Sequence, residues 1–165
     1  MRNFGFPPSI DKNTKIVIFG TFPGEDSLRK KQYYGHKQNQ FWKLLSSVID
    51  KDLVTMDYND RLNTLLKHHI GIWDVIESCE RKGSSDTEIV NEELNDFSRL
   101  RKYKSIKLLC FNGKNQEKYL KKHKNDLSKI LPNIKTIALP STSPAHALKS
   151  FKEKLEDWKE IKKCI

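Results

Sequence analysis

The chain has 165 residues, 36% of them hydrophobic, which is enough to bury the core of a globular domain. We therefore expect residues 1–165 to form a single domain. Its 31 Lys and Arg residues exceed its 21 Asp and Glu residues, and the formal net charge of +10 favours an anionic partner, with nucleic acid the first candidate. A merely soluble, lysine-rich protein would carry the same excess, so charge alone leaves both interpretations open.

The cysteine content and the hydropathy argue against several classes of protein. The cysteines are odd in number and widely spaced, which supports neither a disulfide framework nor a Cys-rich zinc or iron–sulfur site: they are Cys79, Cys110 and Cys164. No signal-peptide pattern follows the first residues, and no apolar run approaches the ~20 residues that cross a membrane. We expect a cytoplasmic protein that does not span a membrane.

Short apolar runs, rich in β-branched residues, predict four strands at residues 16–19, 70–76, 106–111 and 134–139. Apolar residues at helical spacing predict helices over 41–49 and 62–69, the second with Asp60 as its cap and Gly71 as its stop. A third helix follows Gly113. The last is expected to start at Pro144, because its apolar residues then share one stripe: Leu148, Phe151, Leu155, Trp158 and Ile161. Residues 51–59 and 80–95 are expected to be loops.

Strands that alternate with helices predict an α/β fold with a mainly parallel sheet between helices. Ligands of such sheets bind outside the carboxyl ends of the strands, and all four predicted ends carry glycines, amides, acids or hydroxyls. The first is followed by residues 20–24 (GTFPG), the second contains Trp73-Asp74, the third ends at Asn112-Gly113, and the fourth at residues 140–144 (PSTSP). Turns favour the same residue types, but their recurrence at one edge of the sheet favours a binding site.

Five of these motifs, taken in order, resemble the uracil-DNA glycosylase superfamily, and most closely its hypoxanthine-DNA (deoxyinosine) glycosylase branch. They are residues 20–24 with Ser27-Leu28, residues 33–42 (YYGHKQNQFW), residues 71–75 (GIWDV), residues 111–113 (FNG) and residues 139–145 (LPSTSPA). The match covers most of the chain. It implies a three-layer αβα sandwich around a four-stranded parallel sheet. It also implies a monofunctional glycosylase that acts on DNA with a damaged or deaminated base, without metal or cofactor. We also expect a monomer.

The resemblance also implies roles for individual residues. Asn39 would be the principal catalytic residue, holding the water or hydrogen-bonding the base, although capping of the helix at 41 is an alternative use of its amide. Asn112 would support it by hydrogen-bonding the flipped base, unless it only forms an Asn-Gly turn. The base pocket would be formed by Gly20, Thr21, Phe22, Pro23, Gly24, Tyr33, Tyr34, His36 and Phe41. Phe41 and Trp42 also begin an amphipathic helix, and we expect Trp42 in the core.

The last motif would contact the DNA backbone. Hydroxyls and amides of Ser141, Thr142 and Ser143 would bind phosphates at the N-terminus of the final helix, where the helix dipole favours anions. Ala145 and His146 fall where relatives insert a wedge into the duplex.

One departure from the family matters for the chemistry. Related branches carry an acid or asparagine beside the first-loop proline, where this chain has Thr21 and Phe22, so the group that activates water is not identified. Glu25 or Asp26, which follow directly, is an alternative group for activating the water. Both residues also suit a structural role as carboxylates in the first turn of a helix. A uracil or mismatch specificity, a catalytically silent nucleic-acid-binding module and a small-molecule α/β enzyme therefore stay as alternatives.

Overall fold

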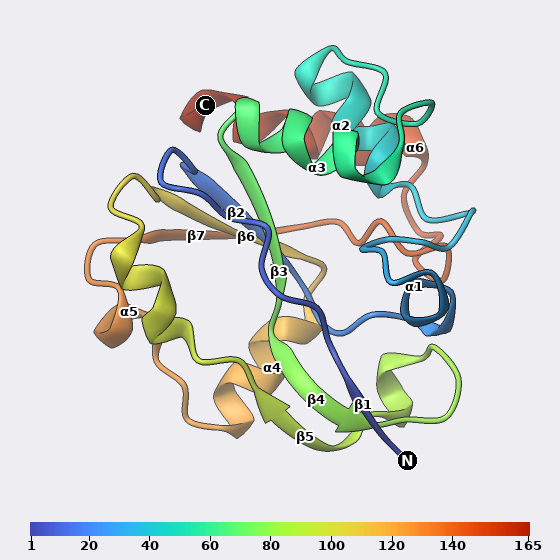
Figure 1. The fold of residues 1–165 in the computed structure, drawn as a ribbon, viewed down its shortest axis with the longest axis vertical. Coiled ribbons are helices and arrows are strands. Elements are labelled where there is room, and N and C mark those ends of the chain that lie inside the picture. The colour runs from blue at the N-terminus through green and yellow to red at the C-terminus, as the bar shows by residue number, and fades with distance from the viewer.

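A computed structural model describes residues 1–165 as an α/β fold with two sheets (Figure 1). The main sheet has four parallel strands in the order β3-β2-β6-β7: Ile70–Asp74, Ile16–Gly20, Leu108–Asn112 and Lys135–Leu139. This confirms the predicted sheet. An antiparallel second sheet, in the order β1-β4-β5, was not expected and comprises Arg2–Phe4, Ile76–Glu80 and Val90–Leu94.

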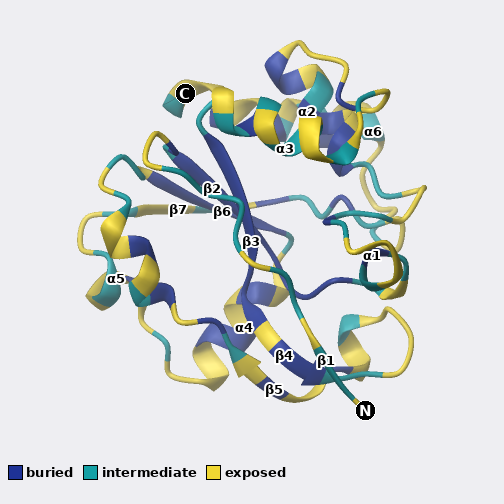
Figure 2. Cartoon of the chain, in the orientation of Figure 1, coloured by how far each residue is buried: buried dark blue, intermediate teal, exposed yellow.

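Successive side chains of the central strands point into two different hydrophobic cores, because side chains alternate across a strand. Ile16 and Ile18 of β2 belong to one core, whereas Val17 and Phe19 belong to the other. Figure 2 shows that β2, β3 and β6 are buried along their length. A sheet that is buried on both faces must be covered on both faces, which produces the three layers.

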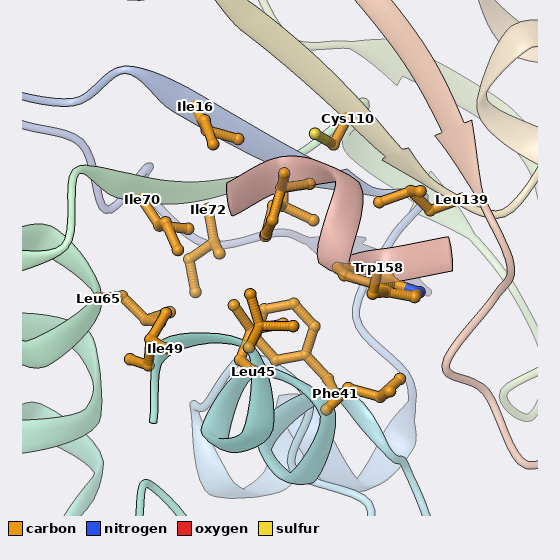
Figure 3. Close-up of a cluster of buried hydrophobic side chains, with 14 of the residues drawn as sticks. Ile16, Phe41, Leu45, Ile49, Leu65, Ile70, Ile72, Cys110, Leu139 and Trp158 are labelled. Atoms are coloured by element: carbon orange, nitrogen blue, oxygen red, sulfur yellow. The ribbon is translucent and has the colours of Figure 1, made fainter. Parts of the chain in front are cut away.

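The first core is covered by three helices on one side of the sheet (Figure 1): α2 (Phe41–Ile49), α3 (Tyr58–Lys67) and α6 (Phe151–Trp158). Figure 3 shows how Phe41, Leu45 and Trp158 reach from α2 and α6 toward Ile72 and Cys110 of the sheet. The other face is covered by α4 (Asn115–Lys122), α5 (Leu127–Ile130) and the second sheet, with 3₁₀ turns at Asp86–Glu88 and Phe97–Lys102. The remaining helical segments are α1 (Glu25–Lys30) and a 3₁₀ turn at Lys159–Cys164.

Several local predictions were wrong. The strand predicted over residues 70–76 ends at Asp74, and after Val75 a separate strand, β4, begins at Ile76; residues 80–95 contain β5 rather than only a loop. Gly71 lies inside β3 instead of stopping a helix, and its missing side chain lets the backbone of Ser9 come close: a Cβ there would lie 2.8 Å from the Ser9 carbonyl oxygen. Helix α3 begins after Asp57, with Asp60 in its first turn.

The final helix begins at residue 151 and not at Pro144. Ser150 and Glu153 form a reciprocal capping box there, in which the Ser150 Oγ accepts from the Glu153 amide at 3.2 Å and the Glu153 Oε2 accepts from the Ser150 amide at 2.7 Å. That pair fixes the start of the helix more strongly than a proline does. Leu148 is consequently 91% exposed in the preceding turn, off the stripe that was predicted to bury it.

A buried ion pair joins β5 to the end of α4. The Glu92 side chain is 1% exposed, and its carboxylate accepts hydrogen bonds from Lys122 and, at 3.0 Å, from the His123 Nε2. Burial alone would raise the pKa of Glu92, but these two hydrogen bonds outweigh it and lower the pKa to about 2. Because the pKa is below the ordinary 4.5, the pair stabilises the fold above that pH and loses its effect as the pH falls toward 2.

Replacement Glu92→Gln is expected to destabilise the fold by about 1–2 kcal/mol at pH 7, since the 59% exposed Lys122 is screened by solvent, and to remove the acid dependence of stability between about pH 4.5 and 2. Urea unfolding at pH 7 and at pH 3 measures both effects. The neighbouring Glu93, whose side chain is 67% exposed and pairs with Arg2, is the matched control, and Glu93→Gln should change stability by less than about 1 kcal/mol. Equal losses in the two variants would contradict the assignment.

Candidate active site

A cleft of about 1870 Å³ opens at the carboxyl ends of the parallel strands. It is larger than the ~300–1,000 Å³ of most small-molecule pockets, and so has room for part of a polymer. All residues that the sequence analysis placed in the base pocket, the catalytic pair or the phosphate contact line this cleft, with one exception, Phe41. The strands therefore bring together motifs that are up to about 120 residues apart in the chain.

The loop after β2 is held rigidly against its neighbours. The amides of Val75 and Ile76 donate to the carbonyls of Gly20 and Thr21 at 2.9 and 3.1 Å. From the other side Arg81, whose side chain is 1% exposed, donates to the Pro23 carbonyl and lies over the Phe22 ring, 5.3 Å from its centroid. The sequence analysis missed Arg81, which follows β4 and carries no motif. It keeps Phe22 in place as a wall of the cleft.

Asn39 lines another side of the cleft. Its side-chain oxygen has a structural role, and its side-chain nitrogen is free for another contact. Its Oδ1 accepts from the Phe41 amide at 3.0 Å, which satisfies an unpaired donor at the start of α2. The residue is half-buried and lines the cleft. The amide Nδ2 group is not used in that contact, so helix capping and a role toward a substrate are compatible in one side chain.

The aromatic residues of the same segment divide between structure and site. Phe41 is fully buried, and its ring stacks beneath that of Tyr34 with 3.7 Å between centroids, so its assignment to the base pocket was wrong: it supports the pocket from behind. Tyr33 is 4% exposed, and its hydroxyl donates to the carbonyls of Phe6 and Pro7 at 3.2 and 3.0 Å. Trp42 lies in the core, as predicted.

Tyr34 differs from the residues around it. Its φ of 54° is in the left-handed region, which is uncommon for a bulky side chain and indicates a conformation that the surroundings impose. The hydroxyl group is buried and donates no hydrogen bond within the protein, although the Asn112 side chain lies beside it. Burial is the first cause of the raised pKa of Tyr34, followed by the charge of Asp74.

Asp74 is the most conspicuous site residue that the sequence analysis did not assign. It ends β3 beside Gly20 of β2, is 4% exposed, and its Oδ2 is buried without a partner. The pKa of Asp74 is raised to about 7, chiefly by burial and also by the charge of Asp86, while Arg81 opposes both. The available signal was an acidic residue at the end of a wholly apolar strand, where a buried charge is costly unless it has a use.

Asn112 and Thr142 bind each other, which changes the role predicted for both. The Asn112 Nδ2 donates to the Thr142 Oγ1 and the Thr142 amide donates to the Asn112 Oδ1, each at 2.9 Å. Thr142 is fully buried, so its predicted contact with a phosphate was wrong. Asn112 joins β6 to the loop after β7 through this pair, which uses one of the two hydrogens of its Nδ2, so its hydrogen bond to a flipped base stays a prediction.

The loop after β7 is fastened to the segment that carries Asn39. The Gln40 amide donates to the Thr142 carbonyl at 3.0 Å, and the buried Lys154 Nζ donates to the Gln40 Oε1 at 3.1 Å and to the His146 carbonyl at 2.8 Å. Direct hydrogen bonds therefore connect these two sides of the cleft.

Ser141 and Ser143 remain accessible in the loop, where each Oγ accepts from the amide two residues on, at 3.2 and 3.3 Å. Because α6 starts only at residue 151, the helix dipole invoked for this site does not act here, and the phosphate contact would depend on hydroxyls and amides alone. Ala145 and His146 follow at the mouth of the cleft.

His36 lies on the outer rim. Its side chain is 47% exposed, with the Nε2 3.9 Å from the Asp26 Oδ2 and the Nδ1 accepting from the Gln38 amide at 3.2 Å. Glu25 and Asp26 occupy the first turn of α1, the structural role that the sequence analysis gave as their alternative.

The structure contains no group of three or more His, Cys, Asp or Glu side chains arranged to hold a metal ion. None of its helices is long and apolar enough to cross a membrane.

Comparison with known proteins agrees with this arrangement. Residues 7–162 match the family model of the uracil DNA glycosylase superfamily. Two curated proteins named hypoxanthine DNA glycosylase are similar: one from Methanosarcina barkeri is 48% identical over 120 residues, 72% of this chain and 76% of that protein, and one from Methanosarcina acetivorans is 38% identical over 160 residues, 95% and 96% of the two chains.

A solved structure shows the same fold. The solution NMR structure of a candidate uracil DNA glycosylase from Methanosarcina acetivorans superimposes with a TM-score of 0.82 at 37% identity and covers 98% of this chain and 96% of its own. With a family match that spans nearly the whole sequence and a cleft in which its five motifs meet, this chain belongs to the uracil DNA glycosylase superfamily.

Proposed function

We propose that this protein is a hypoxanthine-DNA glycosylase, which flips a deaminated base out of the duplex and hydrolyses its N-glycosidic bond to leave an abasic site. The observation that carries the proposal is the meeting of Asn39, Tyr34 and the first loop in one cleft, in a chain similar to two proteins of that name. A base inside a duplex cannot reach such a cleft, so the nucleotide must leave the stack.

The chemistry needs a positioned water and stabilisation of the departing base. As the bond between C1′ and the base nitrogen breaks, its electron pair goes to the base and positive charge develops on the sugar. Asn39 supplies an amide that can orient water at C1′ without a charge of its own, while Phe22 packs against the base. The rigid links around the first loop and residue 40 keep these groups in position before the substrate arrives.

The wider setting follows from the same assignment. Phosphates of DNA are the anionic partner that the net charge of +10 favours. We place the enzyme in the cytoplasm as a monomer with a single domain over residues 1–165 and with no metal or cofactor in its reaction. A uracil or mismatched-thymine specificity is the alternative within the family, and a silent DNA-binding protein the alternative outside catalysis.

Base release separates these functions directly. Matched duplexes carrying one deoxyinosine, one deoxyuridine or one G·T mismatch are treated with excess protein, and alkali cleavage reports abasic sites. We expect hypoxanthine to be released fastest. A preference for uracil would correct the specificity, and tight binding without release of any base would favour the silent DNA-binding protein.

Asn39→Ala is expected to slow single-turnover release by about 100-fold or more, the loss typical of removing one positioned polar group. The substitution also removes the contact with the Phe41 amide, so Asn39→Ser serves as the second variant: its hydroxyl can cap the helix but cannot replace the amide. Both variants should release the base slowly, whereas only Asn39→Ala should lose free energy of unfolding, by about 1 kcal/mol. Asn63→Ala, on the exposed surface of α3, is the control, and a rate near wild type in Asn39→Ser would refute the catalytic role.

Ser141→Ala combined with Ser143→Ala is expected to weaken DNA binding by about 3- to 10-fold, the equivalent of one or two hydrogen bonds. Fluorescence anisotropy with a duplex that contains non-hydrolysable 2′-fluoro-deoxyinosine measures it. Hydroxyls carry no charge, so the dependence of affinity on salt should keep the wild-type slope. Ser47→Ala, exposed on α2, is the control, and unchanged affinity in the double variant would remove these serines from the phosphate contact.

A further inference from the structure

Two buried polar atoms in the wall of the cleft donate no hydrogen bond within the protein. They are the Oδ2 of Asp74 and the hydroxyl oxygen of Tyr34, and both side chains lie against Gly20. A Cβ at Gly20 would be 2.5 Å from the Asp74 Oδ1 and 3.2 Å from the Tyr34 hydroxyl oxygen, so only glycine leaves room for both. Buried polar groups without partners are rare and costly, which indicates that a ligand satisfies them.

The surroundings favour hydrogen-bond donors at this point. A phenol hydroxyl donates, and a carboxyl group donates when it is neutral. The groups that interact with Asp74 are Asp86, which favours the neutral form, Arg81, which opposes it, and the phenols of Tyr33, Tyr34 and Tyr58. Burial outweighs the rest and holds the pKa of Asp74 at about 7, so a large share of the group is neutral near pH 7.

Two donors suit the atom that deamination creates. Deamination replaces an exocyclic amino group, which donates hydrogen bonds, with a carbonyl oxygen, which has two lone pairs to accept them. When the glycosidic bond breaks, part of the electron pair that the base receives is delocalised onto that oxygen. Preorganised hydrogen-bond donors in a site that excludes water stabilise such charge strongly. A neutral Asp beside a Tyr is a known form of oxyanion hole.

We propose that Asp74, as a neutral carboxyl group, and Tyr34 form a two-donor oxyanion hole for the exocyclic carbonyl oxygen of the flipped base. This inference rests on the proposed function. The pair distinguishes a deaminated base from its amino precursor and stabilises the base as it leaves. Asp74 therefore acts on the leaving base and does not activate water. Gly20 is the positioning residue that lets the two donors converge.

The test compares variants across two substrates. Asp74→Ala and Tyr34→Phe should each slow the release of hypoxanthine by about 10- to 100-fold, because each removes one hydrogen bond to the charge that develops on the base. Neither should slow the release of unsubstituted purine, which lacks the carbonyl oxygen, by more than about threefold relative to wild type. Circular dichroism during heating checks that the variants are folded, and Asp60→Asn, exposed on α3, is the control. Equal losses on both substrates would overturn the inference.

The pH profile of Asp74→Asn separates a donor from a water-activating base. Asparagine keeps an N–H donor and cannot ionise, so this variant should release hypoxanthine within about fivefold of wild type at pH 6 and stay constant up to pH 8.5. Wild type should slow by about 10- to 30-fold over that range as Asp74 ionises, because a pKa near 7 lowers the neutral fraction about 30-fold and the carboxylate no longer donates. Loss of all activity in Asp74→Asn would overturn the inference in favour of a general base.

Failure of this inference is distinct from failure of the proposed function. If wild type releases hypoxanthine and the Asp74 and Tyr34 variants match it at every pH, only the oxyanion hole is wrong. If wild type releases no hypoxanthine, the proposed function is wrong and the oxyanion hole falls with it. Gly20→Ala gives an independent check: its Cβ would displace the Asp74 carboxyl, so hypoxanthine release should fall about as far as in Asp74→Ala.

Discussion

The burial of the parallel sheet on both faces is the constraint from which the site follows. Ile18 and Phe19, adjacent in β2, are fully buried in opposite cores, and this fixes the register of every neighbouring strand. Parallel strands in register end at one edge, so the residues that terminate them must meet there. Asp74 faces Gly20 because Ile70 pairs with Ile16 at the start of the two strands. Core packing and site geometry therefore have one cause.

Rigid cross-links between loops complete what the sheet begins. Loops are ordinarily the mobile parts of a fold, yet Arg81 holds the first loop and Lys154 holds both Gln40 and the His146 carbonyl. Each of these cations is buried and has no hydrogen bond to a carboxylate, which lowers the stability of the fold. Such an arrangement is expected where the position of the loops matters more than the stability. A reaction that depends on orienting water and stabilising charge benefits from such preorganised groups.

Much of the fold and cleft could be predicted from sequence, and the failures have physical reasons. Apolar runs and strand ends indicated the sheet and its edge, because burial on both faces leaves a strong local signal. Phe41 was misplaced because the same aromatic residue suits a pocket or the core behind it. The start of α6 depended on the pairing of Ser150 with Glu153, which competes with Pro144. Asp74 was passed over because its importance lies in what surrounds it, not in its neighbours along the chain.

The missing first-loop acid and the presence of Asp74 bear on the same question. An ionised carboxylate near C1′ helps both to activate water and to stabilise the positive sugar, and Thr21 and Phe22 offer neither. Asp74 lies one strand away, and its burial favours the neutral form near pH 7. Asn39 carries no charge. The polar groups of the site therefore favour departure of the base over attack by water, since donors stabilise the anion that leaves while no fixed charge drives the nucleophile. A purine that leaves as a stabilised anion needs only a well-placed, weakly activated water.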